Sequence, residues 1–262
     1  MKRPDCAGII HVASDVSFDA NPNNVVPQVV QSMTNILEAA AKTPTVRRVV
    51  YTSSSIAAVH PTPNQRFMVD SSSYNDIDVR DAWAPPPYLP ERAFAVYGAS
   101  KVEAERTGWE FMKNGSRHFV LNTVLPNFAV GPVLNSEQFG STSGWVRGLY
   151  DGDEELSERM RTFPPQYNVD VRDVARVHVA ALLETDVRSE RLFAFAEPFN
   201  YSRVVEVLQK IDPSRQHYHP PLENEGQDLS VVDTARVTEL FKRMGREGFI
   251  NLEQSLREQF EG

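Results

Sequence analysis

The chain has 262 residues, of which 41% are hydrophobic and 24% charged, a composition that excludes an intrinsically disordered protein. Thirty-five acidic residues against 27 basic ones give a net charge of −8, which argues against nucleic acid and anionic membranes as partners. A single cysteine, Cys6, excludes an intramolecular disulfide and a multi-cysteine zinc site. Because no apolar stretch has the length of a membrane span or a signal peptide, we expect a cytoplasmic protein.

Short apolar runs alternate with helical periodicities along the first half of the chain. We expect strands at 8–14, 48–54 and 118–125, helices at 24–42 and 97–113, and a long loop rich in Pro, Asp and Ser at 57–90. Strands that alternate with helices indicate βαβ units and a parallel sheet.

The second half of the chain is less regular. Its periodicities predict short helical pieces within 131–167, a strand at 191–196, and helices at 170–185, 201–211, 234–244 and 252–260. We expect two domains: a partial Rossmann-like domain at 1–135, and a smaller substrate-binding lobe at 136–262 from which 166–198 returns to the first domain.

The segment Tyr97-Gly-Ala-Ser-Lys101 places a tyrosine and a lysine four residues apart, on one face of the expected helix. An ammonium group within about 4–6 Å of a phenol lowers the phenol pKa by roughly 1–3 units. Such a tyrosine could exchange a proton with a substrate oxygen. The spacing alone is equally compatible with two unrelated residues on a surface helix.

Four hydroxyl residues, 52–55, follow the apolar part of the second expected strand. Ligands of open α/β sheets bind at the carboxyl ends of the strands, where a hydroxyl could hydrogen-bond a substrate oxygen. Serine and threonine also ease a strand into a loop, so this observation alone leaves both interpretations open.

Other candidate sites are weaker. His217 and His219 could bind a metal, but no cysteine or carboxylate pattern completes the site, and we interpret them as loop histidines. A Gly-x-Ser-x-Gly elbow is absent from the sequence, which argues against a serine hydrolase.

Six segments, taken in order, resemble the extended short-chain dehydrogenase/reductases, in particular the branch of dihydroflavonol, cinnamoyl-CoA and fungal aldehyde reductases. The matching segments are GIIHVAS (8–14), RVVYTSS (48–54), YGASKVEAE (97–105), LPNFAVGP (125–132), VDVRDVARVH (169–178) and DLSVVD (228–233). The resemblance implies an α/β, Rossmann-like doubly wound parallel sheet.

The resemblance also implies roles for individual residues. Tyr97 would exchange a proton with the substrate oxygen, Lys101 would lower the Tyr97 pKa and bind the nicotinamide ribose, and Ser54 would orient the substrate carbonyl. Because side chains alternate along a strand, only one of Ser53 and Ser54 should face the site. The implied cofactor-binding residues are Ala13, Ser14, Ser53, Lys101, Pro126 and Phe128.

The glycine-rich turn that binds the dinucleotide pyrophosphate in this family has no counterpart in the sequence. None of its 13 glycines forms a Gly-x-Gly pair, so Gly-x-Gly-x-x-Gly is absent. We expect the sheet to lack the family's first three strands, which leaves 8–14 as an exposed edge through which the chain could form a homodimer.

Two enzymatic hypotheses follow. The first is an NADPH-dependent (or NADH-dependent) reductase of a small apolar or aromatic aldehyde or ketone, using Ser54, Tyr97 and Lys101. The second is a redox-inactive isomerase, lyase or cyclase that uses the same residues without a dinucleotide. A partner-binding pseudoenzyme is a third hypothesis. Trp83, Phe94, Trp145 and Phe163 suggest an apolar ligand, but they would equally suit the packing of the lobe.

Overall fold

The computed structural model describes residues 6–135, 137–138 and 140–261. The chain forms two compact units, each assembled from three separate stretches. Unit 1 comprises Met1–His60, Val69–Leu125 and Val177–Phe193, and unit 2 comprises Pro61–Met68, Pro126–Arg176 and Ala194–Gly262. These boundaries differ from the sequence-based division at 135/136, with 166–198 returning to the first domain, because the chain passes between the units more often than that division allows.

Unit 1 is built on a four-stranded sheet with the order β1-β2-β4-β7. Its strands are β1 (Gly8–His11), β2 (Arg48–Thr52), β4 (Val120–Pro126) and β7 (Arg191–Ala194). The β1–β2 and β2–β4 pairs are parallel, as the alternation of strands and helices predicts, and His11 pairs with Tyr51 at the carboxyl ends. The expected α/β fold with a parallel sheet is confirmed.

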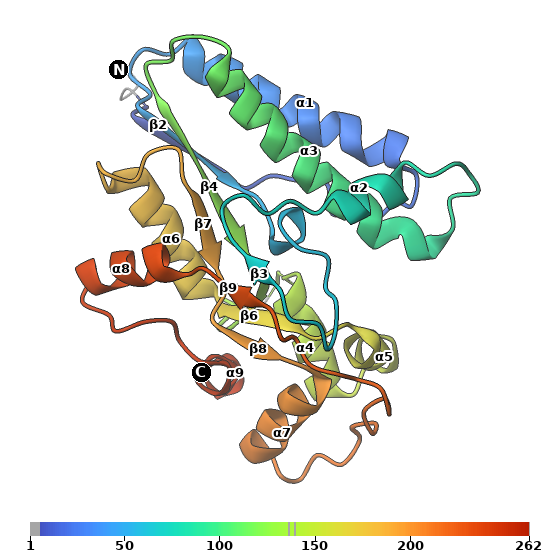
Figure 1. Cartoon of the computed structure of the whole chain (residues 1–262). Coiled ribbons are helices and arrows are strands. Elements are labelled where there is room, and N and C mark those ends of the chain that lie inside the picture. The colour runs from blue at the N-terminus through green and yellow to red at the C-terminus, as the bar shows by residue number, and fades with distance from the viewer. Residues whose placement is uncertain (1–5, 136, 139, 262) are drawn as a thin grey trace. The chain divides into compact units, whose positions relative to one another are not determined.

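Helices cover both faces of this sheet (Figure 1). On one face lie α1 (Pro22–Ala41) and α3 (Ala93–Lys113), which α2 (Asp76–Ala82) joins, and on the other lies the C-terminal part of α6 (Val171–Leu183). Alternation along β2 divides its side chains between the two faces. Tyr51 belongs to the apolar core beneath α1 and α3, whereas Arg48 donates a hydrogen bond to the Ala181 carbonyl oxygen of α6.

Unit 2 contains a three-stranded sheet with the order β5-β6-β8 and several helices around a second apolar core. β5 (Phe128–Val130) is parallel to β6 (Gln166–Asp170), and β6 is antiparallel to β8 (Glu197–Phe199). The helices are α4 (Thr142–Asp151), α5 (Glu154–Thr162), α7 (Tyr201–Ile211), α8 (Ala235–Arg243) and α9 (Leu252–Phe260). The short strands β3 (Met68–Val69) and β9 (Val231–Val232) pair with each other.

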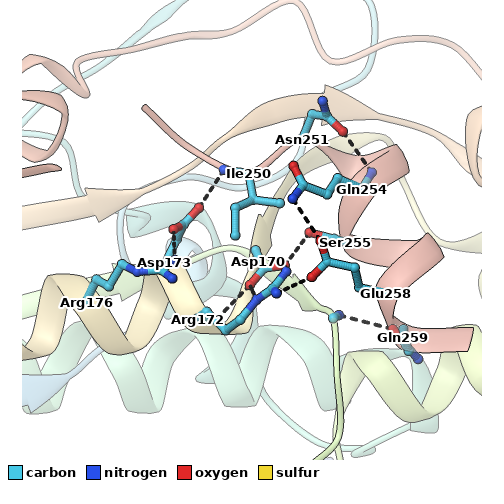
Figure 2. A network of polar contacts seen from close by, with 11 residues as sticks. Asp170, Arg172, Asp173, Arg176, Ile250, Asn251, Gln254, Ser255, Glu258 and Gln259 are labelled. Atoms are coloured by element: carbon cyan, nitrogen blue, oxygen red, sulfur yellow. Dashed lines mark hydrogen bonds and ion pairs between the residues drawn. The ribbon is translucent and has the colours of Figure 1, made fainter. Parts of the chain in front are cut away.

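A polar network joins the end of β6 and the start of α6 to the last helix, α9 (Figure 2). Buried Asp170 accepts hydrogen bonds from Arg172, at 2.7 and 2.8 Å, and from the Ser255 hydroxyl, at 2.6 Å. Arg172 also pairs with Glu258, and Asp173 accepts a hydrogen bond from the Ile250 amide. Charged residues therefore fasten the C-terminal segment to the body of unit 2.

The expected long loop at 57–90 is wrong in part, because it contains α2 and β3, and a short 3-10 turn, η2 (Pro90–Arg92), begins at its last residue. α2 carries no apolar stripe that periodicity could detect. It is held instead by Asn75, whose side chain caps the helix, and by the buried carboxylate of Asp78. Another short turn, η1 (Ser55–Ala57), follows β2.

Candidate active site

The carboxyl ends of β1 and β2 lie at the same edge of the unit 1 sheet, because the two strands are parallel and in register. Side chains at the end of β2 and just beyond it alternate in direction. Thr52 Oγ1 lies 2.7 Å from His178 Nε2, on the α6 side of the sheet, whereas the Ser53 hydroxyl donates to Glu105 of α3 at 2.7 Å. The next residue, Ser54, is half-buried, and its hydroxyl accepts a hydrogen bond from the Ile56 amide at the start of η1.

Tyr97 and Lys101 reach this edge from one face of α3, as their spacing predicts. The Tyr97 phenol is half-buried and hydrogen-bonded to the Ser54 side chain. Lys101 is buried, and its Nζ donates to the Thr52 carbonyl oxygen at 3.1 Å. Nζ lies 5.8 Å from the centre of the Tyr97 ring. Ser54, Tyr97 and Lys101 therefore meet in unit 1, at the end of β2.

The structure as it stands shows burial, and not the charge of Lys101, setting the direction of the Tyr97 pKa shift. Burial raises the pKa of the Tyr97 phenol, and the hydrogen bond with Ser54 only partly opposes that rise. The Lys101 ammonium is engaged by the Thr52 carbonyl rather than by the phenol oxygen. Tyr97 is thus a protonated phenol at neutral pH, suited to donating a proton.

The charge of Lys101 is also set by its surroundings. Burial lowers the pKa of its ammonium to about 8, and the nearby Glu105 carboxylate opposes this change. Most Lys101 side chains are therefore cationic at neutral pH. Lys101 in turn helps burial to lower the pKa of His11, whose Nε2 lies 3.3 Å from the Ser32 hydroxyl.

The other residues assigned to the cofactor fall into two groups. Ala13 and Ser14 follow β1 at the same edge, and Ser14 Oγ is a buried atom without a hydrogen-bond partner among the described residues. Phe18, a little further on, lies 5.4 Å from the Tyr97 ring, centre to centre. Pro126 and Phe128 belong to unit 2, where Phe128 is buried in an aromatic core.

The aromatic residues that suggested an apolar ligand divide in the same way. Trp145 and Phe163 pack against Phe128 in the core of unit 2, which supports the packing interpretation for this pair. In unit 1, by contrast, Trp83 and Phe94 are 43% and 41% exposed.

The two loop histidines have ordinary polar partners. His217 Nε2 lies 3.0 Å from the Leu149 carbonyl oxygen, and His219 pairs with Glu154. Across the residues that the structure describes, no group of three or more His, Cys, Asp or Glu side chains could hold a metal ion. In the same part of the chain, no helix is both long and apolar enough to cross a bilayer.

Sequence reasoning missed Glu105, Phe18 and Gly98. Glu105 lies four residues after Lys101, and repetition of the Tyr97–Lys101 spacing was the signal that could have identified it. Phe18 adopts a left-handed backbone conformation (φ 54°), which its sequence does not indicate. Gly98 lies against Asp78 of α2, so closely that a Cβ atom there would be 2.4 Å from a carboxylate oxygen.

Comparison with known proteins assigns the chain to a family. A family described as Male sterility protein, an NAD-binding domain, matches residues 4–150. Aldehyde reductase 2 of Sporidiobolus salmonicolor is 37% identical over 254 residues, which are 96% of this chain and 73% of that protein. The ketoreductase adrE of Penicillium roqueforti is 36% identical over 260 residues, 95% of this chain and 73% of the relative.

Solved structures agree on the fold. Gre2 of Candida albicans in complex with NADPH has a TM-score of 0.77 at 23% identity, over 98% of this chain and 76% of that one. Vestitone reductase from alfalfa has a TM-score of 0.71 at 22% identity, over 98% and 75% of the two chains. The chain belongs to the extended short-chain dehydrogenase/reductases. It is an oxidoreductase of the carbonyl reductase kind, and the redox-inactive alternative is not favoured.

The family implies a nicotinamide dinucleotide as cofactor, and the residues present fit one end of it. The cationic Lys101 and the unpartnered hydroxyl of Ser14 provide donors at one sheet edge, which suit the ribose and amide of a nicotinamide nucleoside. The glycine-rich turn that would bind the pyrophosphate has no counterpart in the sequence.

Proposed function

We propose that this protein reduces apolar aldehydes or ketones to alcohols with NADPH, and that Ser54, Tyr97 and Lys101 carry the proton chemistry. The observation that carries the proposal is the convergence of these three side chains at the end of β2, with Tyr97 hydrogen-bonded to Ser54. The family assignment and the names of the relatives support the reaction class.

The roles follow from the protonation states. A phenol with a raised pKa holds its proton at neutral pH and can give it to an oxygen on which negative charge develops. Ser54 orients that oxygen by a hydrogen bond beside the phenol. The Lys101 ammonium stabilises negative charge on the phenol oxygen after the proton has left.

Lys101 and Ser14 would hold the nicotinamide ribose. When bound, the dinucleotide supplies the hydride that reduces the carbonyl carbon. NADPH is proposed over NADH because Gre2 of Candida albicans was solved with NADPH and a related protein is named an NADPH-dependent methylglyoxal reductase. Half-exposed Trp83 and Phe94 in unit 1 favour substrates with an apolar or aromatic group.

The test combines binding with turnover. Calorimetry with NADPH and NADH should show tighter binding of NADPH. A test aldehyde should then be reduced with loss of the reduced-nicotinamide absorbance. Tyr97→Phe removes only the phenol oxygen, so we expect unchanged NADPH binding and a loss of kcat of at least about 10²-fold.

Tyr88→Phe is the matched control, because Tyr88 is another phenol of unit 1, 36% exposed, and it should retain full activity. Turnover by Tyr97→Phe at the wild-type rate would contradict the proposal. Turnover by protein stripped of dinucleotide would instead favour an isomerase, lyase or cyclase that uses the same side chains.

A further inference from the structure

Glu105 is a fully buried carboxylate that the proposed proton chemistry does not use. It lies one helical turn beyond Lys101 and two turns beyond Tyr97 on α3. Its oxygens accept hydrogen bonds from Ser53 at 2.7 Å, from Thr123 at 3.0 Å and from Trp109 at 3.3 Å. Glu105 therefore joins α3 to the residue that follows β2 and to the middle of β4, the two central strands of the sheet.

Arg191 of β7 completes the surroundings of this carboxylate. Its Nε lies 2.7 Å from Glu105 Oε1, and the two side chains are 5% and 0% exposed. Nη1 of the same guanidinium donates to the carbonyl oxygens of Ser71, at 3.0 Å, and Ser73, at 2.6 Å. The group also lies 4.1 Å from the centre of the Tyr74 ring. The pair thus extends the connection to the segment that leads into α2.

We propose that the Glu105–Arg191 pair is the positioning device of the active site and fixes the end of β2 that carries Ser54. The Glu105 carboxylate also lies one helical turn from Lys101 on α3, where its charge favours the cationic form of the lysine. Ser53, the neighbour of Ser54, is held directly by the carboxylate. A buried ion pair adds little stability compared with well-packed apolar residues, so a pair that binds the neighbour of Ser54 is better explained by positioning.

Lys101 faces groups from several elements. Glu105 and Tyr97 belong to its own helix, Tyr51 of β2 lies with its ring centre 5.4 Å from Nζ, and His11 of β1 interacts with its charge. Of these, Glu105 is the group whose charge opposes the effect of burial on the Lys101 pKa. Removing that charge should therefore make Lys101 lose its proton at lower pH.

The first measurement requires no turnover. The Lys101 side-chain amine is followed by NMR in lysine-labelled protein, with the signal assigned from Lys101→Arg. In Glu105→Gln, which keeps the length of the side chain but removes its charge, the midpoint should shift down by about 1 pH unit. Glu105→Asp retains the charge and should remain closer to the wild type. Asp76→Asn neutralises an exposed carboxylate of α2 that pairs with Arg106 of α3, and it should leave the Lys101 midpoint unchanged.

The second measurement rests on the proposed function and separates positioning from stability. Glu105→Gln leaves Arg191 buried and unpaired, so the double variant Glu105→Gln/Arg191→Met, which neutralises both partners, should recover stability to denaturant. If the pair positions Ser54, the double variant should still lose about 10- to 100-fold in kcat/KM.

The outcomes are distinct. An unshifted Lys101 midpoint in folded Glu105→Gln would overturn the electrostatic part of the proposal, and wild-type kcat/KM in the double variant would overturn the positioning part. If the wild-type protein itself shows no turnover, the proposed function fails, and the Lys101 titration still decides the effect of Glu105 on its charge.

Discussion

Gly98 offers a sharp test of the packing behind Tyr97. A Cβ atom at this position would lie 2.4 Å from Asp78 Oδ2 and 2.9 Å from Asp78 Cβ. Asp78 cannot easily move, because it is buried and its carboxylate is held by His60 at 2.7 Å and by Asn75 at 2.6 Å. Gly98→Ala must therefore push α2 away from α3.

Two opposing terms set the size of the effect. Alanine in place of glycine favours a helix by about 1 kcal/mol, whereas overpacking a buried contact costs about 1–3 kcal/mol. Since the clash is with a pinned side chain, the upper part of that range applies. We expect the free energy of unfolding to fall by about 1–2 kcal/mol, which lowers Tm by about 4 °C.

Gly108→Ala is the matched control on the same helix. There the added Cβ would meet the terminal methyl of Met33 at 2.2 Å, the far end of a flexible side chain that can move aside. The gain in helix propensity should offset that adjustment, and the net change should stay within about 0.5 kcal/mol. Urea denaturation followed by circular dichroism measures both variants. A Gly98→Ala variant as stable as the wild type, or an equal loss in Gly108→Ala, would show that contact with Asp78 does not limit the space at Gly98.

Three further predictions concern pH, the C-terminal helix and association. The hydrogen bond to Asp78 raises the pKa of His60, so protonated His60 should stabilise the fold fully below the unfolded pKa of about 6.5 and lose this effect as the pH rises through the higher folded pKa. The free energies of unfolding of wild type and His60→Asn, measured by denaturation, should therefore converge at alkaline pH. Burial favours a higher pKa for Asp170, but the hydrogen bonds from Arg172 and Ser255 outweigh burial and lower the pKa, so the Asp170 carboxylate should hold α9 in place at neutral pH and release it in acid. Asp170→Asn should therefore accelerate amide exchange in α9 at neutral pH but not in acid, and equal exchange at neutral pH would show that Asp170 does not hold α9. β1 is the edge strand of its sheet and Ile10 is 39% exposed, so we expect the chain to form a homodimer through β1. Sedimentation should show a weaker dimer for Ile10→Lys, and a wild-type monomer at every concentration would contradict the prediction.

The sequence predicted best where one strong physical pattern dominates. The apolar run that became β2 and the periodicity that became α1 were sufficient, because burial against a parallel sheet requires those patterns. The same holds for Tyr97 and Lys101, whose spacing places them on one face of any α-helix, whatever surrounds it. The strand expected at 8–14 was too long, because β1 ends at His11.

What could not be predicted depends on tertiary contacts. α2 is held by a cap and a buried carboxylate rather than by an apolar stripe. Burial of the phenol raises the Tyr97 pKa, and Lys101 binds the Thr52 carbonyl oxygen instead of the phenol oxygen. The four-residue spacing of Tyr97 and Lys101 predicts neither of these contacts. Phe128 belongs to the segment 125–132 that resembles the family's cofactor-binding region, but its side chain packs in the aromatic core of unit 2.

The division of the chain has a consequence for synthesis on the ribosome. Unit 1 requires Val177–Phe193, and β7 is the last strand to join its sheet, beside β4. Until about residue 193 has emerged, β4 presents an open strand edge, and Glu105 lacks the guanidinium that balances its charge. A nascent chain that pauses earlier would expose both the edge and a carboxylate without its partner, so synthesis up to about residue 193 is the stage at which chaperone binding should matter most.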